Sequence, residues 1–212
     1  MRKEMVRFSI VMPVYLGYYK TAAKDREKKF IRAVSSVLAQ THPLWELLII
    51  SDGCEKSVQI AHDNNLLEDN RVKMFKIKRG SLWGGSPRNT GIKKATGEYV
   101  IYLDADDEYR SNYLRNLSDE MLVKEADWYV VDDLIYDKNE GYVIRKSHLL
   151  HRGKCGTSNI IHKPTLNVFW PESGTYAHDF VFINILRATS NNYHRIPPVG
   201  YVVQHIPGLY DR

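Results

Sequence analysis

The first half of the chain alternates between continuous apolar runs and segments whose apolar residues recur at helical spacing. Short continuous runs are typical of strands covered on both faces, and the helical spacing is typical of amphipathic helices. The predicted strands cover residues 8–15, 45–50, 72–77 and 99–103, and the predicted helices cover 25–40, 55–67 and 86–95. Lysines interrupt the run at 72–77, which favours an edge position. This order of elements predicts an open, mostly parallel α/β sheet flanked by helices.

The second half has a less regular pattern. It predicts helices at residues 113–124 and 178–188 and strands at 128–131, 142–145, 160–161 and 201–206, with a turn at 137–141. A loop at 164–176 precedes the last helix. No repeat or linker separates the halves, so we expect a single domain over 1–212, with a regular front half (1–107) and an irregular back half (108–212).

The composition is that of a globular protein. Hydrophobic residues make up 43% and charged residues 26% of the 212 positions, which excludes a disordered, collagen-like or coiled-coil chain. No apolar run approaches the ~20 residues that cross a bilayer, and Pro13 interrupts the apolar start without a signal-peptide cleavage site after it. Cys54 and Cys155 fit neither a zinc motif nor a disulfide framework. We therefore expect a cytoplasmic protein with reduced thiols.

The charge is distributed unevenly along the chain. A net charge of +5 taken alone favours a polyanionic partner, either nucleic acid or a membrane surface. Residues 1–30 hold 8 basic and 3 acidic groups and so carry the whole excess, which leaves peripheral contact of the N-terminus with a membrane open. Beyond them, residues 71–94 carry 8 basic and no acidic groups, whereas residues 98–140 carry 13 acidic and 4 basic groups.

Two aspartates follow the last strand of the front half. Asp104 and Asp106 are two positions apart at the end of the strand, so their side chains point to the same side. Paired carboxylates beside a basic segment suit Mn²⁺ or Mg²⁺ when the ion also holds a diphosphate. The alternative is a polar turn that caps the next helix. Against it, four acids within residues 104–108 repel one another next to a buried strand.

Two common nucleotide fingerprints are missing from the sequence. The first strand is followed by Gly17 alone and not by G-x-G-x-x-G, and no G-x-x-x-x-G-K-[ST] occurs anywhere. The chain is therefore predicted to be neither a dinucleotide-dependent dehydrogenase nor a P-loop NTPase.

Four blocks of sequence, in order, resemble one family. They are VMPVY at 11–15, SVLAQT with WELLIISDG at 36–53, PRNTGI at 87–92 and GEYVIYLDADD at 97–107. Together they closely resemble the family 2 glycosyltransferases of the GT-A fold. The resemblance implies a nucleotide-sugar donor, with a UDP-sugar as our expectation, and a Mn²⁺ or Mg²⁺ ion held through the D-x-D motif. It also implies transfer with inversion to a hydroxyl of a glycan or other acceptor.

The resemblance also implies the residues that bind the nucleotide. Pro13 and Tyr15 would border the base and ribose, and Asp52 would hydrogen-bond the uracil edge. Ser51 stands where the family usually has a first acid before Asp52. Arg88 matches the arginine that lies against the nucleotide.

The metal residues come from two distant segments. By resemblance, Asp104 would contact the ribose or sugar, with a direct bond to the metal left open, and Asp106 would bind the metal. His205 lies in the predicted closing strand, where related enzymes often carry a histidine that reaches the metal. Imidazole is a suitable further ligand for Mn²⁺.

The catalytic base is expected at the start of the last helix. Asp179 matches the aspartate of the family's short acidic motif, with His178 where a glutamate is common. An inverting transfer is a single displacement, so a carboxylate must take the acceptor's proton as it attacks. The alternative is that Asp179 only complements the positive end of its helix. The loop aromatics are Trp83, Phe169, Trp170 and Tyr176, and Trp170, just before the base, is the acceptor-site candidate.

Three other functions fit the sequence less well. A processive polysaccharide synthase is disfavoured because no membrane span and no Q-x-x-R-W segment follow Asp179. A nucleotidyltransferase would need a glycine-rich, basic loop after the first strand, and residues 15–20 are a poor match to such a loop. A basic nucleic-acid-binding domain could use Tyr18, Tyr19 and the 71–94 stretch, although we expect no nucleic acid partner.

Overall fold

The computed structural model describes residues 5–20, 22–80, 84–149, 152–172, 177–206 and 210–211. Two of the loop aromatics, Trp83 and Tyr176, lie outside these ranges. No helix in the described ranges is long and apolar enough to cross a membrane.

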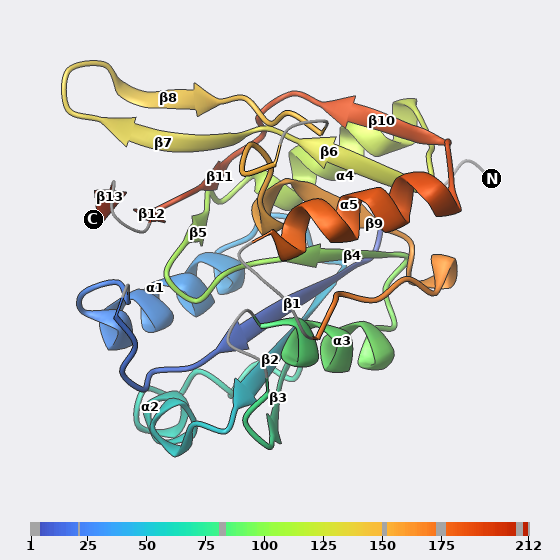
Figure 1. Ribbon diagram of the computed structural model, residues 1–212. Helices are drawn as coiled ribbons and strands as arrows, with labels where there is room; N and C mark the ends of the chain where they lie inside the picture. The colour runs from blue at the N-terminus through green and yellow to red at the C-terminus, as the bar shows by residue number, and fades with distance from the viewer. Residues whose placement is uncertain are drawn as a thin grey trace.

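A seven-stranded sheet forms the centre of the molecule (Figure 1). Its strands are β1 (Phe8–Val14), β2 (Trp45–Asp52), β3 (Val72–Ile77), β4 (Tyr99–Tyr102), β6 (Trp128–Val131), β9 (Ile160–His162) and β10 (Tyr193–Ile196). They are ordered β10-β6-β9-β4-β1-β2-β3, and β9 alone runs antiparallel to its neighbours, β4 and β6. The predicted mostly parallel sheet with β3 at its edge is therefore confirmed.

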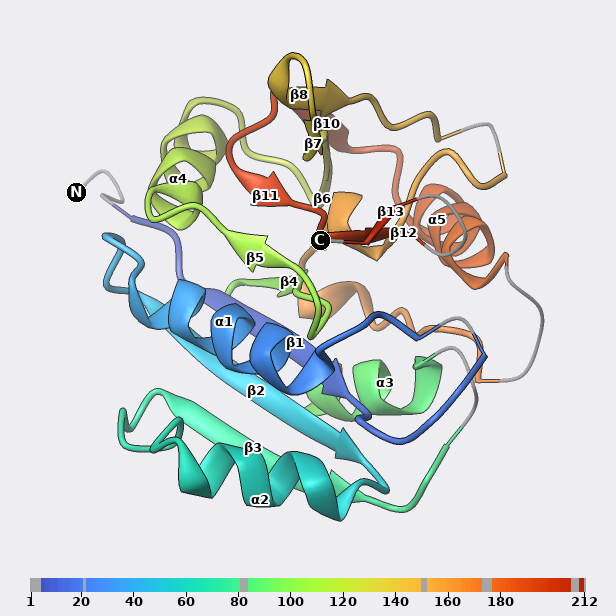
Figure 2. The same ribbon diagram turned by 90° about the vertical axis from the view of Figure 1, so that its left-hand side faces the viewer.

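Helices cover both faces of this sheet. They are α1 (Arg26–Leu38), α2 (Glu55–Asp63), α3 (Gly85–Lys94), α4 (Tyr113–Val123) and α5 (His178–Thr189). The apolar sides of α1, α2 and α4 pack into one buried cluster, and those of α3 and α5 pack into a second on the opposite face (Figure 2). The α/β prediction from the alternating pattern is thus confirmed.

The central strands are apolar on both sides because both sides are covered. In β1, Phe8, Ile10 and Met12 face the first cluster, while Val11 faces the second. All eight residues of β2 are buried. On the second face α3 approaches β1 so closely that a Cβ at Gly91 would lie 2.4 Å from Cγ1 of Val11. This close approach carries the N-terminal end of α3 to the carboxyl ends of the strands.

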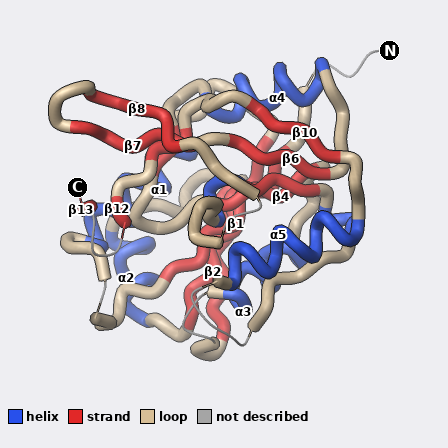
Figure 3. The backbone as a smooth tube through the Cα atoms, turned by 45° about the horizontal axis from the view of Figure 1, so that its top comes forward, coloured by secondary structure: helices blue, strands red, loops and turns tan. Residues whose placement is uncertain are grey.

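Two smaller sheets extend the fold at the carboxyl ends of the central strands. A four-stranded sheet has the order β5 (Glu108–Tyr109), β11 (Tyr201–Val202), β7 (Asp133–Asp137) and β8 (Gly141–Arg145). The second sheet joins β12 (His205–Ile206) to β13 (Tyr210–Asp211), and short 3₁₀ helices lie at η1 (Thr157–Asn159) and η2 (Pro164–Leu166). The β7–β8 hairpin projects from the body of the molecule (Figure 3).

The second half contains a strand, β7, that the sequence analysis did not predict. The strand at Tyr142–Arg145 pairs with β7 and not with β6, which stays in the central sheet. The pattern missed β7 because Asp132 and Asp133, which normally indicate a turn, are buried there and paired with arginines. The predicted closing strand is also two short strands, β11 and β12, in different sheets.

Candidate active site

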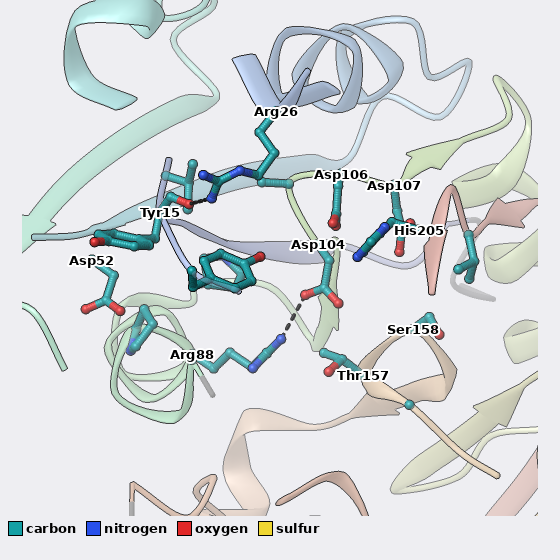
Figure 4. A pocket seen from close by; sticks show the side chains of 18 of the residues that line it. Tyr15, Arg26, Asp52, Arg88, Asp104, Asp106, Asp107, Thr157, Ser158 and His205 are labelled. Carbon is teal, nitrogen blue, oxygen red and sulfur yellow. Dashed lines mark hydrogen bonds and ion pairs between the residues drawn. The ribbon is translucent and has the colours of Figure 1, made fainter. Parts of the chain in front are cut away.

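A pocket of about 510 Å³ lies at the carboxyl ends of β1, β2 and β4 (Figure 4). Both halves of the chain line it. Eight of the nine site residues predicted from the sequence are on its wall, namely Pro13, Tyr15, Asp52, Arg88, Asp104, Asp106, Asp179 and His205. Residues up to 192 positions apart in the sequence are thereby brought together, as expected for the edge of a parallel sheet where ligands bind.

One end of the pocket pairs Asp52 with an arginine. Nη1 of Arg79 donates to Oδ2 of Asp52 at 2.8 Å, and the backbone N–H of Gly80 donates to Oδ1 at 2.7 Å. The guanidinium of Arg79 also lies 3.3 Å from the ring centroid of Tyr15. Gly53, at φ +63°, permits this arrangement, because a Cβ there would lie 2.7 Å from the backbone N of Arg79. A hydrogen-bond acceptor, Asp52, and a hydrogen-bond donor, Arg79, therefore lie side by side next to the Tyr15 ring.

Arg26 holds the loop that follows β1. Its Nη1 donates to the carbonyl oxygen of Tyr15 at 2.9 Å, and its Nη2 donates to the carbonyl oxygens of Leu16 at 3.1 Å and Gly17 at 2.6 Å. The guanidinium lies 5.0 Å from the ring centroid of Tyr19. Arg26 therefore fixes the loop that carries two of the aromatic residues lining the pocket.

The N-terminal end of α3 places Arg88 beneath the acids. Nη2 of Arg88 donates to Oδ1 of Asp104 at 2.8 Å, and its side chain is 7% exposed. The next residue, Asn89, exchanges two hydrogen bonds with the backbone of Trp170, at 2.9 and 2.7 Å. The P-R-N sequence near the start of α3 thus supplies a cation to the pocket and ties a distant loop to the same helix.

The acids after β4 are crowded together. Burial, together with the neighbouring Asp104, raises the pKa of Asp106 to about 6. Burial and the charges of both neighbouring acids also hold the pKa of Asp107 well above its usual value. Asp107 accepts hydrogen bonds from the Tyr201 hydroxyl at 2.8 Å and the Gln204 N–H at 2.7 Å, so it anchors the C-terminal segment.

His205 enters the same space from that C-terminal segment. The carboxyl groups of Asp104 and Asp106 and the ring of His205 point toward a common region (Figure 4). On its other side the ring contacts Asp211, with Nδ1 3.2 Å from Oδ1, and Asp211 also forms an ion pair with Lys29. The histidine is therefore oriented through its Nδ1, which is typical of imidazoles that bind a metal through the other nitrogen.

These residues fit a divalent cation that is shared with a phosphate ligand. In the described part of the chain, no group of three or more Asp, Glu, His or Cys side chains is placed to hold a metal ion by itself. Mg²⁺ and Mn²⁺ typically take one or two carboxylates and complete their shell with phosphate oxygens and water. A cation there would also relieve the repulsion that raises the pKa of Asp106.

Asp179 lies in the first turn of α5 and faces the pocket from the back half. Its Oδ1 accepts a hydrogen bond from Oγ1 of Thr157 at 3.0 Å and lies 3.2 Å from Nε2 of His178. Its side chain is 22% exposed, so the carboxylate is oriented but still reachable by a ligand. This geometry suits a group that takes a proton from a bound hydroxyl.

The family model described as "Glycosyl transferase family 2" matches residues 9–188. The chain belongs to glycosyltransferase family 2. Among similar curated proteins, the glycosyltransferase GlyG of Streptococcus pneumoniae serotype 4 is 26% identical over 63% of this chain. WfgD of Escherichia coli, a UDP-Glc:α-D-GlcNAc-diphosphoundecaprenol β-1,3-glucosyltransferase, is 32% identical over 50% of it. The chain spans only 41% of GlyG and 37% of WfgD.

Solved structures share the fold at low identity. TarS of S. aureus in complex with UDP-GlcNAc superposes with a TM-score of 0.73 at 19% identity, covering 96% of this chain and 60% of that one. The mannosyltransferase PcManGT of Pyrobaculum calidifontis, in complex with GDP-Man and Mn²⁺, gives 0.65 at 14% identity, covering 97% and 59%. The predicted GT-A fold and the family resemblance are confirmed. Family membership favours sugar transfer over the nucleotidyltransferase and nucleic-acid-binding alternatives.

Of the nine predicted site residues, Trp170 is the one that does not line the pocket of the family 2 domain. It is 2% exposed, stacks on Phe182 with ring centroids 4.1 Å apart, and donates from Nε1 to the Tyr102 hydroxyl at 2.9 Å. Its ring also lies 5.1 Å from the guanidinium of Arg88. Both its ring and its N–H are engaged in the core, so the structure does not bring Trp170 to the pocket with the other predicted residues, and it packs against Arg88 instead.

A Trp170→Ala substitution is therefore expected to lower stability. Removing a buried indole costs about 3–5 kcal/mol of unfolding free energy. Urea unfolding of the purified protein measures the loss, and Phe169→Ala, at a partly buried neighbour, is the control with a smaller expected loss. Full stability combined with weaker acceptor binding would contradict the core assignment.

Two pocket arginines in the front half of the chain were missed from the sequence, as was Arg145 in the back half. Arg79 follows β3 and Arg26 begins α1, and both line the pocket. For Arg79 a signal existed, because it stands at the carboxyl end of a predicted parallel strand. Arg26 carried no comparable signal, since its contacts are to backbone carbonyls that only the folded loop brings within reach.

Proposed function

We propose that this domain transfers a sugar from a UDP-sugar to a hydroxyl group of an acceptor, with inversion and with Mn²⁺ or Mg²⁺ bound. The observation that carries the proposal is the meeting of Asp179 with Arg88, Asp104 and Asp106 in one pocket. A proton acceptor and a phosphate-binding, cation-binding cluster are the two parts that a single displacement needs.

The Asp52 end of the pocket suits a uracil base. Its carboxylate accepts hydrogen bonds and the adjacent Arg79 donates them, which matches the neighbouring N–H and C=O of the uracil edge. Tyr15 offers an aromatic surface beside them. The similar TarS structures hold UDP and UDP-GlcNAc, which favours uridine over guanosine as the donor nucleoside.

The centre of the pocket suits the diphosphate. Asp106 and His205 would hold the cation, with Asp104 as a further oxygen ligand, and the chemistry it would supply is neutralisation of the charge on the departing diphosphate. Arg88 adds a fixed positive charge at the same place, because Asp104 and the Trp170 ring hold its guanidinium. Relatives in fold that were solved with Mn²⁺ support a divalent ion.

Asp179 would act as the base in the displacement. The acceptor oxygen forms a bond to the anomeric carbon while the bond from that carbon to the diphosphate oxygen breaks and its electron pair leaves with the diphosphate. The acceptor proton passes to the Asp179 carboxylate, which Thr157 keeps in place through its hydrogen bond. Attack from the side opposite the leaving group inverts the anomeric configuration.

A panel of nucleotide sugars tests the proposal. We expect a UDP-sugar to bind in calorimetry when Mn²⁺ is present, to be hydrolysed slowly without acceptor, and to lose binding when EDTA is added. GDP-sugars and ADP-sugars serve as controls with matched phosphates. Failure of every donor to bind with metal present would contradict the function.

We propose that the enzyme acts in the cytoplasm, where the basic residues 1–30 offer a surface for peripheral contact with a membrane.

A further inference from the structure

The short helix η1 fixes two carboxylates at the acceptor side of the pocket. Oγ1 of Thr157 donates to Asp179 at 3.0 Å, and Oγ of the next residue, Ser158, donates to Oδ2 of Asp133 at 2.6 Å. Both Thr157 and Ser158 line the pocket (Figure 4). A ligand group bound at Asp179 therefore lies close to the side chain that pairs with Asp133.

That partner is Arg145, at the end of β8. Its Nε and Nη2 donate to the two oxygens of Asp133 at 2.7 and 2.6 Å. Asp133 is fully buried, whereas the Arg145 side chain is 35% exposed and lines the pocket. A guanidinium has five N–H groups, and a fork with a carboxylate uses two of them. Arg145 is thus a cation of fixed orientation on the wall beside the proposed base.

The chain around Arg145 and η1 carries only positive charge. Residues 141–171 contain no Asp or Glu, and their basic residues are Arg145, Lys146, Arg152, Lys154 and Lys163. Lys146, Arg152 and Lys154 are exposed and belong to the segment that leads from β8 to η1. Lys163 differs, because Glu125 and Asp127 pair with it at 3.1 and 3.3 Å. Of these basic residues, Arg145 lines the pocket, and the three exposed ones follow it in sequence on the way to η1.

We propose that the acceptor of this enzyme carries a phosphate group, which binds at Arg145 while the acceptor hydroxyl lies at Asp179. The inference rests on the proposed function and names the class of its second substrate. In the proposed function the donor diphosphate binds at Arg88 and Asp106, which line the pocket from the other half of the chain. A fixed guanidinium in a segment without acidic residues fits a phosphate better than a carboxylate because a phosphate carries up to two charges and three free oxygens.

A matched pair of probes tests this acceptor class. α-D-Glucose 1-phosphate and methyl α-D-glucoside differ in the phosphate, and their binding is measured by calorimetry with UDP and Mn²⁺ at saturation. We expect the phosphate to bind at least about tenfold more tightly, and Arg145→Gln to reduce this preference to less than about twofold. Equal binding of the two probes to the wild-type protein overturns the proposal.

Arg195 provides the control. It pairs with buried Asp132 at 2.5 Å, as Arg145 pairs with Asp133, but it is not among the residues that line the pocket. Arg195→Gln should therefore disturb the fold to a similar extent and keep the preference for phosphate. Loss of the preference in both variants would make it a consequence of folding and overturn the role of Arg145.

Two further variants guard against misfolding, since Arg145→Gln leaves a buried carboxylate unpaired. The triple change Lys146→Gln, Arg152→Gln and Lys154→Gln affects exposed side chains only and should weaken phosphate binding several-fold. Arg145→Lys keeps the positive charge but loses the paired hydrogen bonds to Asp133, and it should also weaken phosphate binding. Wild-type preference in both of these variants overturns the proposal.

An anionic membrane surface is the other phosphate-bearing ligand that the basic segment could contact. If the triple variant loses binding to vesicles of anionic phospholipid but keeps its affinity for α-D-glucose 1-phosphate, the segment serves a membrane surface and the proposal is wrong. Absence of UDP binding to the wild-type protein contradicts the proposed function instead, and the preference for phosphate is then measured without UDP.

Discussion

Asp179→Asn is expected to lower the rate of sugar transfer by about 10²- to 10⁴-fold, the usual contribution of a general base. Asparagine keeps the shape of the side chain and can still accept the hydrogen bond from Thr157, so the pocket should retain its structure. What it cannot do is take the acceptor proton. Binding of a UDP-sugar with Mn²⁺ should therefore stay close to that of the wild-type protein.

Transfer rate and donor affinity are measured on the same preparation, together with unfolding in urea. The alternative role of Asp179, complementing the end of α5, predicts instead a stability loss of about 0.3–1 kcal/mol and normal transfer. Glu27→Gln is the matched control because Glu27 is the acid in the first turn of α1 and lies outside the pocket. Equal transfer by the wild-type protein and Asp179→Asn would remove Asp179 from the role of base.

Asp106→Asn is expected to abolish the metal dependence of donor binding. Replacing the carboxylate by an amide removes the negative charge that a divalent cation requires, while Asp104 remains engaged with Arg88. The metal-free protein should not lose stability, because the substitution removes an acid whose pKa burial and Asp104 raise. A loss of metal response without a loss of stability would distinguish a ligand from a structural acid.

Calorimetry of UDP binding, with Mn²⁺ and with EDTA, measures this effect. Asp119→Asn, at an exposed position of α4, is the control for a change of charge alone. If UDP binding to Asp106→Asn still responds to EDTA as in the wild-type protein, the ion lies elsewhere and the assignment fails.

Much of the front half could be predicted because its signals are local. A strand buried on both faces reads as a continuous apolar run, as in β2, and the polar residue after it falls at the ligand-binding edge of a parallel sheet. Asp52 and Asp104 follow from this pattern together with the family resemblance, and both line the pocket.

The remaining features depend on partners distant in sequence. Asp133 is buried in a strand only because Arg145, Ser158 and Asn159 satisfy its oxygens. Trp170 stands in a loop, which suggested an exposed ring, but its N–H meets the hydroxyl of Tyr102, 68 positions earlier. Neither the spacing nor the type of these residues reveals such pairing.

The reversed direction of β9 has a consequence for how this fold can diversify. Because β9 runs against β4 and β6, the chain enters it at the same edge where the neighbouring strands end, so η1 and the segment before it open onto the pocket. In a parallel strand that entry would lie at the far edge of the sheet. The side of the pocket proposed for the acceptor can therefore change in length and sequence through one connection, while β1, β2 and β4 keep their register.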